Sequence, residues 1–445
     1  MAEQVIGAAG RTRLLEARAH PVATLATMLV AFAYSGIFIQ MLPVTAPAVV
    51  ASWGLPSTAM ATPMAAILLG SGLGTICGGV VADMLGRRKA IGATLALLIA
   101  LVAAASMAST PLILAVIMFF GGLAMGAMYA SAMALVTELV PDRRRPLIIS
   151  FTVASLPVGL GICSLASALI VPLTGWSAFF QLVALAGLPV LLAFLCLVPE
   201  SPSFIARDAT RMNEYRRVIE RLGLEPAAAA HPVDGAGDAA PREPLFSRFG
   251  AVIRANPRAA IGIWGLFAGT YIFGNAILSW LPTALNGLGY SMAFASGSLT
   301  AWSIASMTGT PIAGWCLYRF GVRTAATIGA LLGALTCLGL MLVSMRLFTS
   351  ELAVLCILPL GGFASAGVVT ALYTLVAEAY PPAVRAMGIG LSDALGRVGG
   401  TLAAFSGIYI IAGSGAAVFF GLLVALMLAI AAYLAWLHPY GKAPE

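Results

Sequence analysis

Long runs of apolar residues recur along this chain, and they constrain its fold more than any other feature. About twenty apolar residues in a helix cross the ~30 Å hydrocarbon core of a bilayer. The runs reach that length, and only 9% of the 445 residues are charged, whereas a soluble domain carries about a quarter. Glycine is abundant, with 48 residues, as expected where membrane helices approach closely. The sequence therefore predicts a polytopic membrane protein.

Short polar segments divide the apolar sequence into twelve predicted spans. The first six lie near residues 22–48, 57–82, 89–107, 110–137, 147–172 and 175–198. The second six lie near residues 259–283, 290–317, 323–345, 350–377, 384–411 and 413–437. We expect an all-α protein built from two six-helix bundles, residues 22–198 and 259–437. The tails, 1–21 and 438–445, flank these bundles. The linker, 199–258, joins them, and its pattern predicts a short amphipathic helix over 211–222.

The basic residues predict the orientation of these spans, because Lys and Arg collect in the cytoplasmic loops of membrane proteins. With the N-terminus inside, every Lys and Arg except Arg346 and Arg397 falls in a tail, the linker or a loop on the cytoplasmic side. We therefore expect both termini in the cytoplasm. The N-terminal tail lacks the short apolar core of a signal peptide. A composition rich in Ala and Arg favours a bacterium, and hence the bacterial inner membrane.

The cysteines and histidines argue against a metal or cofactor site. The six cysteines lie within apolar runs without paired spacing, which is typical of small core residues. All three histidines, His20, His231 and His438, lie outside the spans. We expect no metal, no cofactor and no enzymatic activity, because no nucleophile–base pair is placed at membrane depth. The net charge of +7 comes from the loops, so nucleic acid is not an expected partner.

The two halves of the chain carry related motifs. The pattern E-x2-P-x3-R follows the fourth span as Glu138 to Arg145, and the tenth span as Glu378 to Arg385, at an offset of 240 residues. Repeats of this kind indicate structurally similar halves. Two halves in the same orientation place a substrate site at their interface, near the midplane. Rocking one half against the other would expose that site to each side in turn.

A second motif, between the second and third spans, carries a family resemblance. It contains Gly79, Asp83, Gly86, Arg87 and Arg88 in the pattern G-x3-D-x2-G-R-R, which resembles the signature of the major facilitator superfamily. The resemblance covers essentially the whole chain. It implies that the first, fourth, seventh and tenth helices line a central cavity.

Four shorter segments resemble particular branches of that superfamily. Residues 199–202 (Pro-Glu-Ser-Pro) resemble a segment of its sugar porters and metabolite–proton symporters. Residues 279–282 (Ser-Trp-Leu-Pro), with 46–47 and 53–55, resemble aromatic acid–proton symporters. The chain departs from those symporters where their first-helix acidic motif aligns with residues 35–38 (Ser-Gly-Ile-Phe). Their fourth-helix arginine aligns with Met118. Asp393 is therefore the only deeply placed carboxylate able to carry a proton.

The second motif suits a gate between the two halves. Gly86 permits a sharp turn, Asp83 can face a helix N-terminus of the opposite half, and Arg87 and Arg88 can pair with acids such as Glu138. The expected gating residues are Asp83, Gly86, Arg87, Arg88, Glu138, Arg145, Glu378 and Arg385. The alternative is that the basic residues serve only to set the topology.

Two charged side chains fall deep within a predicted span, where a charge is costly and usually marks function. Asp393 and Arg397 are four residues apart in the eleventh span, so they share one helical face and can pair. Arg397 lies about 20 Å along that span. It can bind a substrate carboxylate, and Asp393 can hold Arg397 or exchange a proton. The alternative is a permanent structural pair, but the matching fifth-span positions, Val153 and Pro157, are apolar, which favours function.

Other polar or aromatic residues at mid-depth complete the expected substrate-binding set. They are Tyr34, Gln40, Tyr271, Asn275, Trp302 and Tyr373. Taken singly, each is also typical of packing or of hydrogen bonding between helices. As a set they indicate a partly aromatic cavity with few hydrogen-bonding groups. Trp280, near the outer end of the seventh span, is expected to be an interfacial anchor.

These features predict a secondary transporter that works by alternating access. The leading hypothesis is a proton-coupled importer of a small organic anion, an aromatic or other carboxylate. The expected partners of this monomeric protein are the substrate, H+ and the lipid bilayer. An exporter of amphipathic compounds and a sugar or polyol porter are alternatives. A sensor on the same scaffold is a further one, which no appended soluble domain supports.

Overall fold

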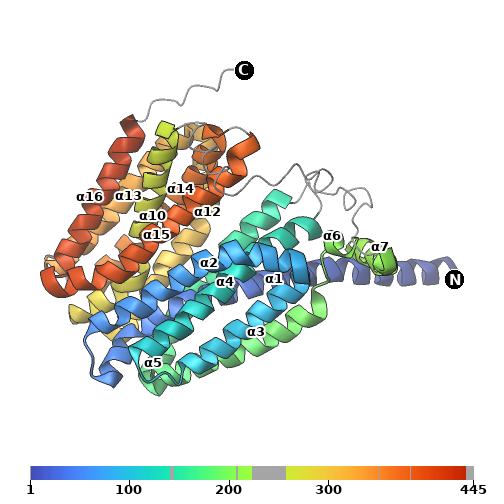
Figure 1. The fold of residues 1–445 in the computed structure, drawn as a ribbon, viewed down its shortest axis with the longest axis horizontal. Helices are drawn as coiled ribbons and strands as arrows, with labels where there is room; N and C mark the ends of the chain where they lie inside the picture. Colours follow the sequence, from blue (N-terminus) through green and yellow to red (C-terminus); the bar gives the residue numbers. More distant parts are fainter. Residues whose placement is uncertain are drawn as a thin grey trace.

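Every regular element in the described part of the computed structural model is a helix (Figure 1). The structure describes residues 2–140, 145–206, 209–222, 257–348, 350–380 and 382–436. Up to the linker the elements are α1 (Ala2–Trp53), η1 (Ser57–Met60), α2 (Ala61–Leu85), α3 (Arg87–Ala105), α4 (Pro111–Leu139), α5 (Arg145–Leu197), α6 (Pro202–Ile205), η3 (Ala209–Arg211) and α7 (Met212–Leu222). After the linker they are α10 (Pro257–Gly287), α11 (Met292–Gly297), α12 (Leu299–Phe320), α13 (Val322–Ser344), α14 (Glu351–Ala379), α15 (Pro382–Ser414) and α16 (Ala416–Trp436).

Ten segments of the described chain are long and apolar enough to cross a membrane. The predicted spans 147–172 and 175–198 both lie in α5, where the backbone leaves the helical conformation at Gly175, with φ 82°. The predicted span 290–317 corresponds to α11 and α12, which are not among the ten. The remaining predicted spans each coincide with one long helix. The helical architecture is therefore confirmed, whereas the count of twelve spans stays a prediction.

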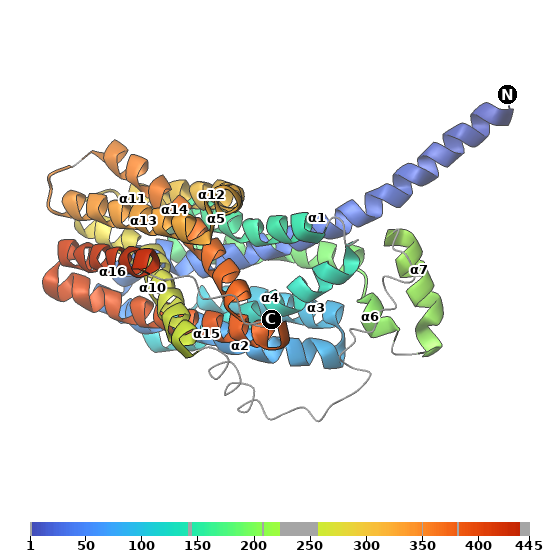
Figure 2. The same ribbon diagram turned by 90° about the horizontal axis from the view of Figure 1, so that it is seen from above.

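The helices form two bundles that pack in the same pattern (Figures 1 and 2). In the first bundle, α1 to α5, helix α2 packs against α4 and α1 against α5. In the second bundle, α10 to α16, helix α12 packs against α14 and α10 against α15. The bundles meet where α15 lies against α2 and α12 against α5. The same pairing in both bundles agrees with the two similar halves that the sequence repeat predicts.

Glycines turn the chain at corresponding points of the two bundles. Gly86 joins α2 to α3 with φ 95°, and Gly321 joins α12 to α13 with φ 81°. Gly175 and Gly415, with φ 82° and 87°, are separated by the same 240 residues as Glu138 and Glu378. Residues with a side chain rarely adopt these left-handed conformations. The sharp turns therefore explain why both halves keep glycine at these positions.

A second repeated glycine allows two helices to touch in each bundle. A Cβ atom on Gly159 of α5 would lie 1.8 Å from the carbonyl oxygen of Ala33 in α1. A Cβ atom on Gly399 of α15 would lie 2.7 Å from the carbonyl oxygen of Ala268 in α10. Both distances are shorter than a non-bonded contact allows. The α1–α5 and α10–α15 interfaces therefore require glycine at these positions. Small residues commonly allow such close packing of helices in membrane proteins.

Two further expectations have opposite outcomes. The amphipathic helix predicted over 211–222 is confirmed by α7 (Met212–Leu222), which lies at one end of the first bundle (Figure 2). The expectation for Trp280 is wrong, because its side chain is 0% exposed and its Nε1 donates to the carbonyl oxygens of Ala403 and Ala404, at 3.3 and 3.1 Å. Helix α10, which carries Trp280, directs this indole toward α15 rather than toward a membrane surface.

Candidate functional site

The charged pair of α15 is present as expected. The guanidinium of Arg397 donates from Nε to Oδ2 of Asp393 at 2.9 Å, and the two side chains are only 22% and 18% exposed. Their spacing of one helical turn allows this contact. An isolated charge would be strongly disfavoured at this depth, so the pairing accounts for how both charges are kept there.

Two tyrosines from neighbouring helices hold the second oxygen of Asp393. The hydroxyl of Tyr373 in α14 donates to Oδ1 at 2.8 Å, and the hydroxyl of Tyr271 in α10 donates to the same oxygen. Phe267 packs edge-on against Tyr373, with ring centroids 5.3 Å apart. The expected residues Tyr271 and Tyr373 are thus brought together with Asp393 and Arg397. Three helices of the second bundle converge on one carboxylate.

Arg397 also reaches the first bundle. Its Nη1 donates to the hydroxyl oxygen of Ser71 in α2 at 3.3 Å, and that hydroxyl donates to the carbonyl oxygen of Leu68 at 2.9 Å. Tyr129 of α4 lies within the range of electrostatic interaction with both Asp393 and Arg397. The polar cluster therefore spans the interface between the bundles, where a transporter of this architecture places its substrate.

Ser71 and Tyr129 carry only weak signals in the sequence, and neither was expected in the site. Ser71 lies beside Gly70 in a run of glycines that indicates helix packing, and that packing is real, since Gly70 and Gly74 lie against α4. Tyr129 lies in the fourth span, which the family resemblance places on the cavity. That resemblance was the one signal able to single it out.

The guanidinium of Arg397 retains unused donors. It carries five N–H groups, and its bonds to protein use Nε and Nη1. Among the described residues, none accepts a hydrogen bond from Nη2. The cluster can therefore accept an additional anion, with arginine as the group best suited to a carboxylate.

A small cavity at the bundle interface contains two further expected residues. This α1–α10 cavity has a volume of 180 Å³ and is lined by residues of α1, α2, α5 and α10, including Gln40 and Asn275. Asn275 donates from Nδ2 to the backbone oxygen of Tyr271 at 3.0 Å. Gln40 is 1% exposed, and its Nε2 has no hydrogen-bond partner among the described residues. These two residues line the same cavity from different bundles.

Tyr34 and Trp302 are placed elsewhere. The hydroxyl of Tyr34 donates to the carbonyl oxygen of Val183 at 3.2 Å, which ties α1 to α5. Trp302 is 2% exposed and packs within the second bundle against Phe273, with ring centroids 5.7 Å apart, and against the backbone of Gly361. The contacts of Trp302 are of the packing kind that was the alternative for this residue. Tyr34 also lines a second cavity, between α1, α5 and α12.

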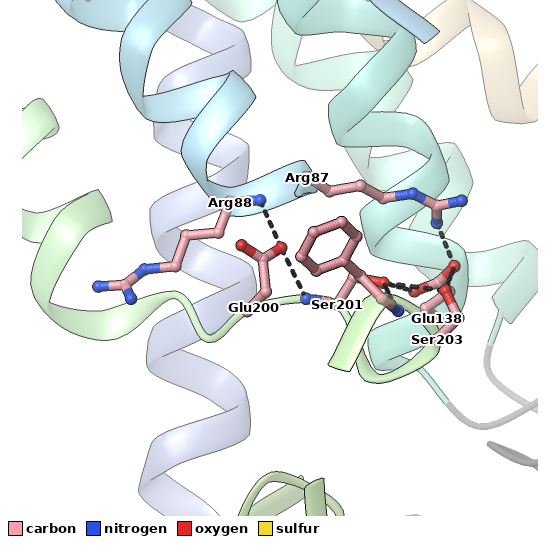
Figure 3. Close-up of polar contacts among 7 residues, drawn as sticks. Arg87, Arg88, Glu138, Glu200, Ser201 and Ser203 are labelled. Atoms are coloured by element: carbon pink, nitrogen blue, oxygen red, sulfur yellow. Dashed lines mark hydrogen bonds and ion pairs between the residues drawn. The ribbon is translucent and has the colours of Figure 1, made fainter. Parts of the chain in front are cut away.

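A separate polar network lies at the end of the first bundle where α2 turns into α3 (Figure 3). The guanidinium of Arg87 forms an ion pair with Glu138 of α4. The hydroxyls of Ser201 and Ser203 donate to the same carboxylate, the latter at 2.7 Å. The ion pair expected for Arg87 is therefore present. All of its members belong to α3, α4 and the segment that follows α5, so it links elements of one bundle.

Glu200 forms the other half of this network (Figure 3). Its Oε1 accepts from the backbone nitrogens of Arg88 at 2.9 Å and Ser201 at 3.0 Å. A Cβ atom on Gly86 would lie 2.7 Å from its Oε2. The guanidinium of Arg88 donates to the carbonyl oxygen of Leu195, rather than to an acid as expected. Glu200 binds the start of α3, where the helix dipole favours a negative charge.

The remaining expected gating contacts fall outside the described side chains. They concern Asp83, Arg145, Glu378 and Arg385, whose helices are described but whose side-chain positions are not. The acid and serines of residues 200–203 were not among the expected gating residues. The signal for these residues in the sequence is the Pro-Glu-Ser-Pro segment at 199–202.

No group of three or more His, Cys, Asp or Glu is arranged to hold a metal ion within the described ranges. The site is thus one arginine, one carboxylate and several hydroxyl and amide groups. Such a set can bind small polar molecules and exchange protons.

Sequence comparison relates the whole arrangement to known transporters. The profile of the family described as Major Facilitator Superfamily matches residues 24–361. A gallate transporter of Pseudomonas putida is 28% identical over 377 residues, covering 82% of this chain and 80% of the relative. A 4-hydroxybenzoate transporter of Pseudomonas aeruginosa is 26% identical over 381 residues, covering 81% and 80%. A niacin transporter of Acinetobacter baylyi is 26% identical over 346 residues, covering 75% and 74%.

Solved structures agree on the fold. The xylose transporter of E. coli in a partially occluded, inward-open conformation superposes with a TM-score of 0.76, covering 96% of this chain and 100% of that one, at 14% sequence identity. A POT family transporter in complex with 5-aminolevulinic acid gives a TM-score of 0.70 at 16% identity, covering 94% and 96%. At these identities the likeness concerns the fold alone. The two-bundle architecture is thereby confirmed.

Proposed function

Because the chain belongs to the major facilitator superfamily, we propose that it is a secondary active transporter that moves a small aromatic carboxylate together with a proton. The observation that carries this proposal is the arrangement of Arg397. Its Nε is held by Asp393, its Nη1 by Ser71 of the other bundle, and its Nη2 is unused among the described residues. Arginine is the side chain best matched to a carboxylate.

Exchange of partners at Arg397 would couple the proton to the substrate. When Asp393 takes up a proton, it loses its charge and its attraction for Arg397. The buried guanidinium then lacks a counter-ion, which is costly in a low-dielectric site. A substrate carboxylate restores the balance, so the proton and the anion bind together as a neutral pair. Tyr271 and Tyr373 keep Asp393 in place in the absence of substrate.

The bond between Arg397 and Ser71 would connect this exchange to movement of the bundles. It joins α15 to α2 across the interface. A carboxylate that occupies the guanidinium competes with Ser71 for its donors. Binding therefore loosens one contact that holds the bundles in the present arrangement, which favours rocking about the site.

The relatives support an aromatic substrate. Their names identify transporters of gallate, 4-hydroxybenzoate and niacin, which are all single-ring carboxylates. The departures at residues 35–38 and Met118 leave Asp393 and Arg397 as the charges able to perform the proton and anion roles in this chain. The sugar alternative has no such support, since the likeness to the xylose transporter is one of fold.

We also propose the cellular setting. The Arg87 end of the first bundle faces the cytoplasm, because basic residues mark the cytoplasmic side of a membrane protein. Both tails are then cytoplasmic, and the protein is a monomer of the bacterial inner membrane. Its parts are the tails 1–21 and 438–445, the bundles 22–198 and 259–437, and the linker 199–258.

One observation favours the exporter as a second candidate. A cavity of 940 Å³ lies between α1, α5 and α12, with an almost entirely apolar lining. Its polar members bond to backbone carbonyls, as Thr310 does to Ser306 and Ser155 to Thr152. Such a cavity suits an amphipathic compound better than a small anion. Accumulation of apolar dyes in inside-out vesicles, absent from protein-free vesicles, would support this function.

Uptake into proteoliposomes tests the main proposal. With one proton carried per carboxylate, transport of benzoate or 4-hydroxybenzoate is electroneutral. A pH gradient with the interior alkaline should drive uptake, whereas a membrane potential at equal pH should not. Uptake driven by the potential alone would contradict the proposed coupling, and the absence of uptake for every carboxylate tested would contradict the substrate class.

A further inference from the structure

The α1–α10 cavity has the size of one aromatic ring. Its volume is 180 Å³, and an apolar cavity of about 150 Å³ is known to bind benzene. Most of its wall is apolar, with Met64 and Leu68 from α2 and Leu156 from α5. A flat apolar group therefore fits this space. The inference below rests on the proposed function, because it assumes that the carboxylate of the substrate binds Arg397.

The cavity begins one helical turn from the charged cluster. Leu68 lines it, and Ser71, which binds Arg397, lies three residues further along α2. Asn275 lines it, and Tyr271, which binds Asp393, lies four residues earlier in α10. One helical turn corresponds to a rise of about 5.4 Å, which is on the order of the width of a benzene ring. A carboxylate at Arg397 can therefore direct its ring toward the cavity.

Gln40, which lines that space, carries a buried amide donor that is unused among the described residues. Its side chain is 1% exposed and lines the cavity, and its Nε2 has no acceptor among the described residues. A buried donor without a partner is costly, and a ligand that supplies the acceptor removes that cost. The amide therefore favours a ligand with an oxygen or nitrogen acceptor on its ring.

Asn275 presents the complementary acceptor. Its Nδ2 is committed to the backbone oxygen of Tyr271 at 3.0 Å, which fixes the orientation of the amide. Among the described residues, none donates to its Oδ1. A phenolic hydroxyl both accepts and donates a hydrogen bond. It can therefore accept from Gln40 of the first bundle and donate to Asn275 of the second.

We propose that the α1–α10 cavity is the ring subsite, and that Gln40 and Asn275 select aromatic acids with a hydroxyl distant from the carboxylate. The hydroxyl bridges the two bundles at the end of the ring opposite Arg397. An unsubstituted ring fills the same space but leaves both amides unpaired. The protein therefore discriminates between substrates by a polar contact, which rejects analogues more strongly than a change in size does.

Competition between three ligands tests this without altering the protein. Uptake of labelled 4-hydroxybenzoate into proteoliposomes is measured against unlabelled 4-hydroxybenzoate, benzoate and 2-hydroxybenzoate. The 4-hydroxy acid should compete at least tenfold better than the other two, because an ortho hydroxyl lies beside the carboxylate and cannot reach the amides. Equal competition by all three would overturn the ring subsite while leaving carboxylate transport intact. No uptake of any of them would overturn the proposed function itself.

The variant Gln40→Met then assigns the preference to one residue. Methionine has a similar length and no donor, so the preference for 4-hydroxybenzoate over benzoate should fall to within about threefold. The matched control is Thr270→Val, which removes a buried hydroxyl that also lacks a partner among the described residues but does not line the cavity. Its preference should match the wild type. A Gln40→Met protein that transports and keeps the wild-type preference would overturn the role of Gln40.

Discussion

Arg397 of α15 donates a hydrogen bond to Ser71 of α2 at 3.3 Å, and this contact crosses the interface between the two bundles. The same guanidinium is paired with Asp393 on its own helix. One side chain therefore links the carboxylate that can take up a proton with the helix of the opposite bundle. The consequences of this double contact can be measured separately.

Replacing Ser71 by alanine should shift the equilibrium between the two access states. The variant loses an interbundle bond to a charged group, worth about 1.5 kcal/mol, or roughly a tenfold change in that equilibrium. Spin labels on α2 and α15 would report it as a change in the populations of two distances. Ser164→Ala is the control, because that buried hydroxyl bonds within its own helix to Leu160. Identical distance distributions for Ser71→Ala and the wild type would remove this bond from the mechanism.

Replacing Asp393 by asparagine should separate transport from the pH gradient. The amide keeps hydrogen bonding with Tyr271 and Tyr373 but cannot bind a proton. Downhill exchange of labelled for unlabelled 4-hydroxybenzoate should persist, while accumulation driven by the pH gradient should fall at least tenfold. Glu351→Gln, at the start of α14, should accumulate substrate as the wild type does. Gradient-driven accumulation by Asp393→Asn would identify another proton carrier.

Glu138 should stabilise the first bundle rather than a contact between bundles. It accepts from Arg87, Ser201 and Ser203, so Glu138→Gln should lower the free energy of unfolding by about 1–2 kcal/mol. Thermal unfolding in detergent measures the loss. Glu214→Gln removes a surface pair with Arg211 and should cost less than about 0.5 kcal/mol. If Glu138→Gln altered the access states and left unfolding unchanged, the network would be a gate.

Glycines in the long helices should differ in how well they tolerate substitution by alanine, according to the atoms around them. Gly159→Ala places a methyl group 1.8 Å from the backbone oxygen of Ala33, so α1 and α5 must separate and the folded yield should fall sharply. Gly399→Ala should be milder, since its nearest backbone oxygen is 2.7 Å away. Gly265→Ala meets nothing within 4 Å and should be neutral or slightly stabilising. Equal yields from all three, by fluorescence-detected chromatography, would contradict these interfaces.

The helical fold could be predicted closely because the membrane imposes a simple rule on sequence. A segment that crosses hydrocarbon must be apolar, long and internally hydrogen-bonded. Helices such as α3 and α13 therefore begin and end within about two residues of the predicted bounds. The offset of 240 residues that relates Glu138 to Glu378 also relates the turns at Gly175 and Gly415. Repetition in the sequence thus predicts repetition in space.

The site was predictable only in part, because depth in the membrane does not say which way a side chain points. Asp393 and Arg397 were evident from the cost of burying charge. Tyr34 lies at a similar depth but bonds to Val183 within its bundle. Ser71 enters the site only because a partner from the other bundle reaches it. Contacts between segments far apart in sequence, such as these, need the structure.

Uptake by Arg397 variants tests the central claim most directly. Each protein is reconstituted into proteoliposomes with an alkaline interior. The proteins are the wild type, Arg397→Ala, Arg397→Lys and a control, Arg319→Ala. Arg319 lies at the end of α12. Initial uptake of 4-hydroxybenzoate should fall at least a hundredfold in Arg397→Ala. Arg397→Lys should recover part of it, because lysine keeps the charge without the planar fork. Arg319→Ala should match the wild type. Uptake by Arg397→Ala at the wild-type rate would contradict the assignment of Arg397 as the carboxylate site.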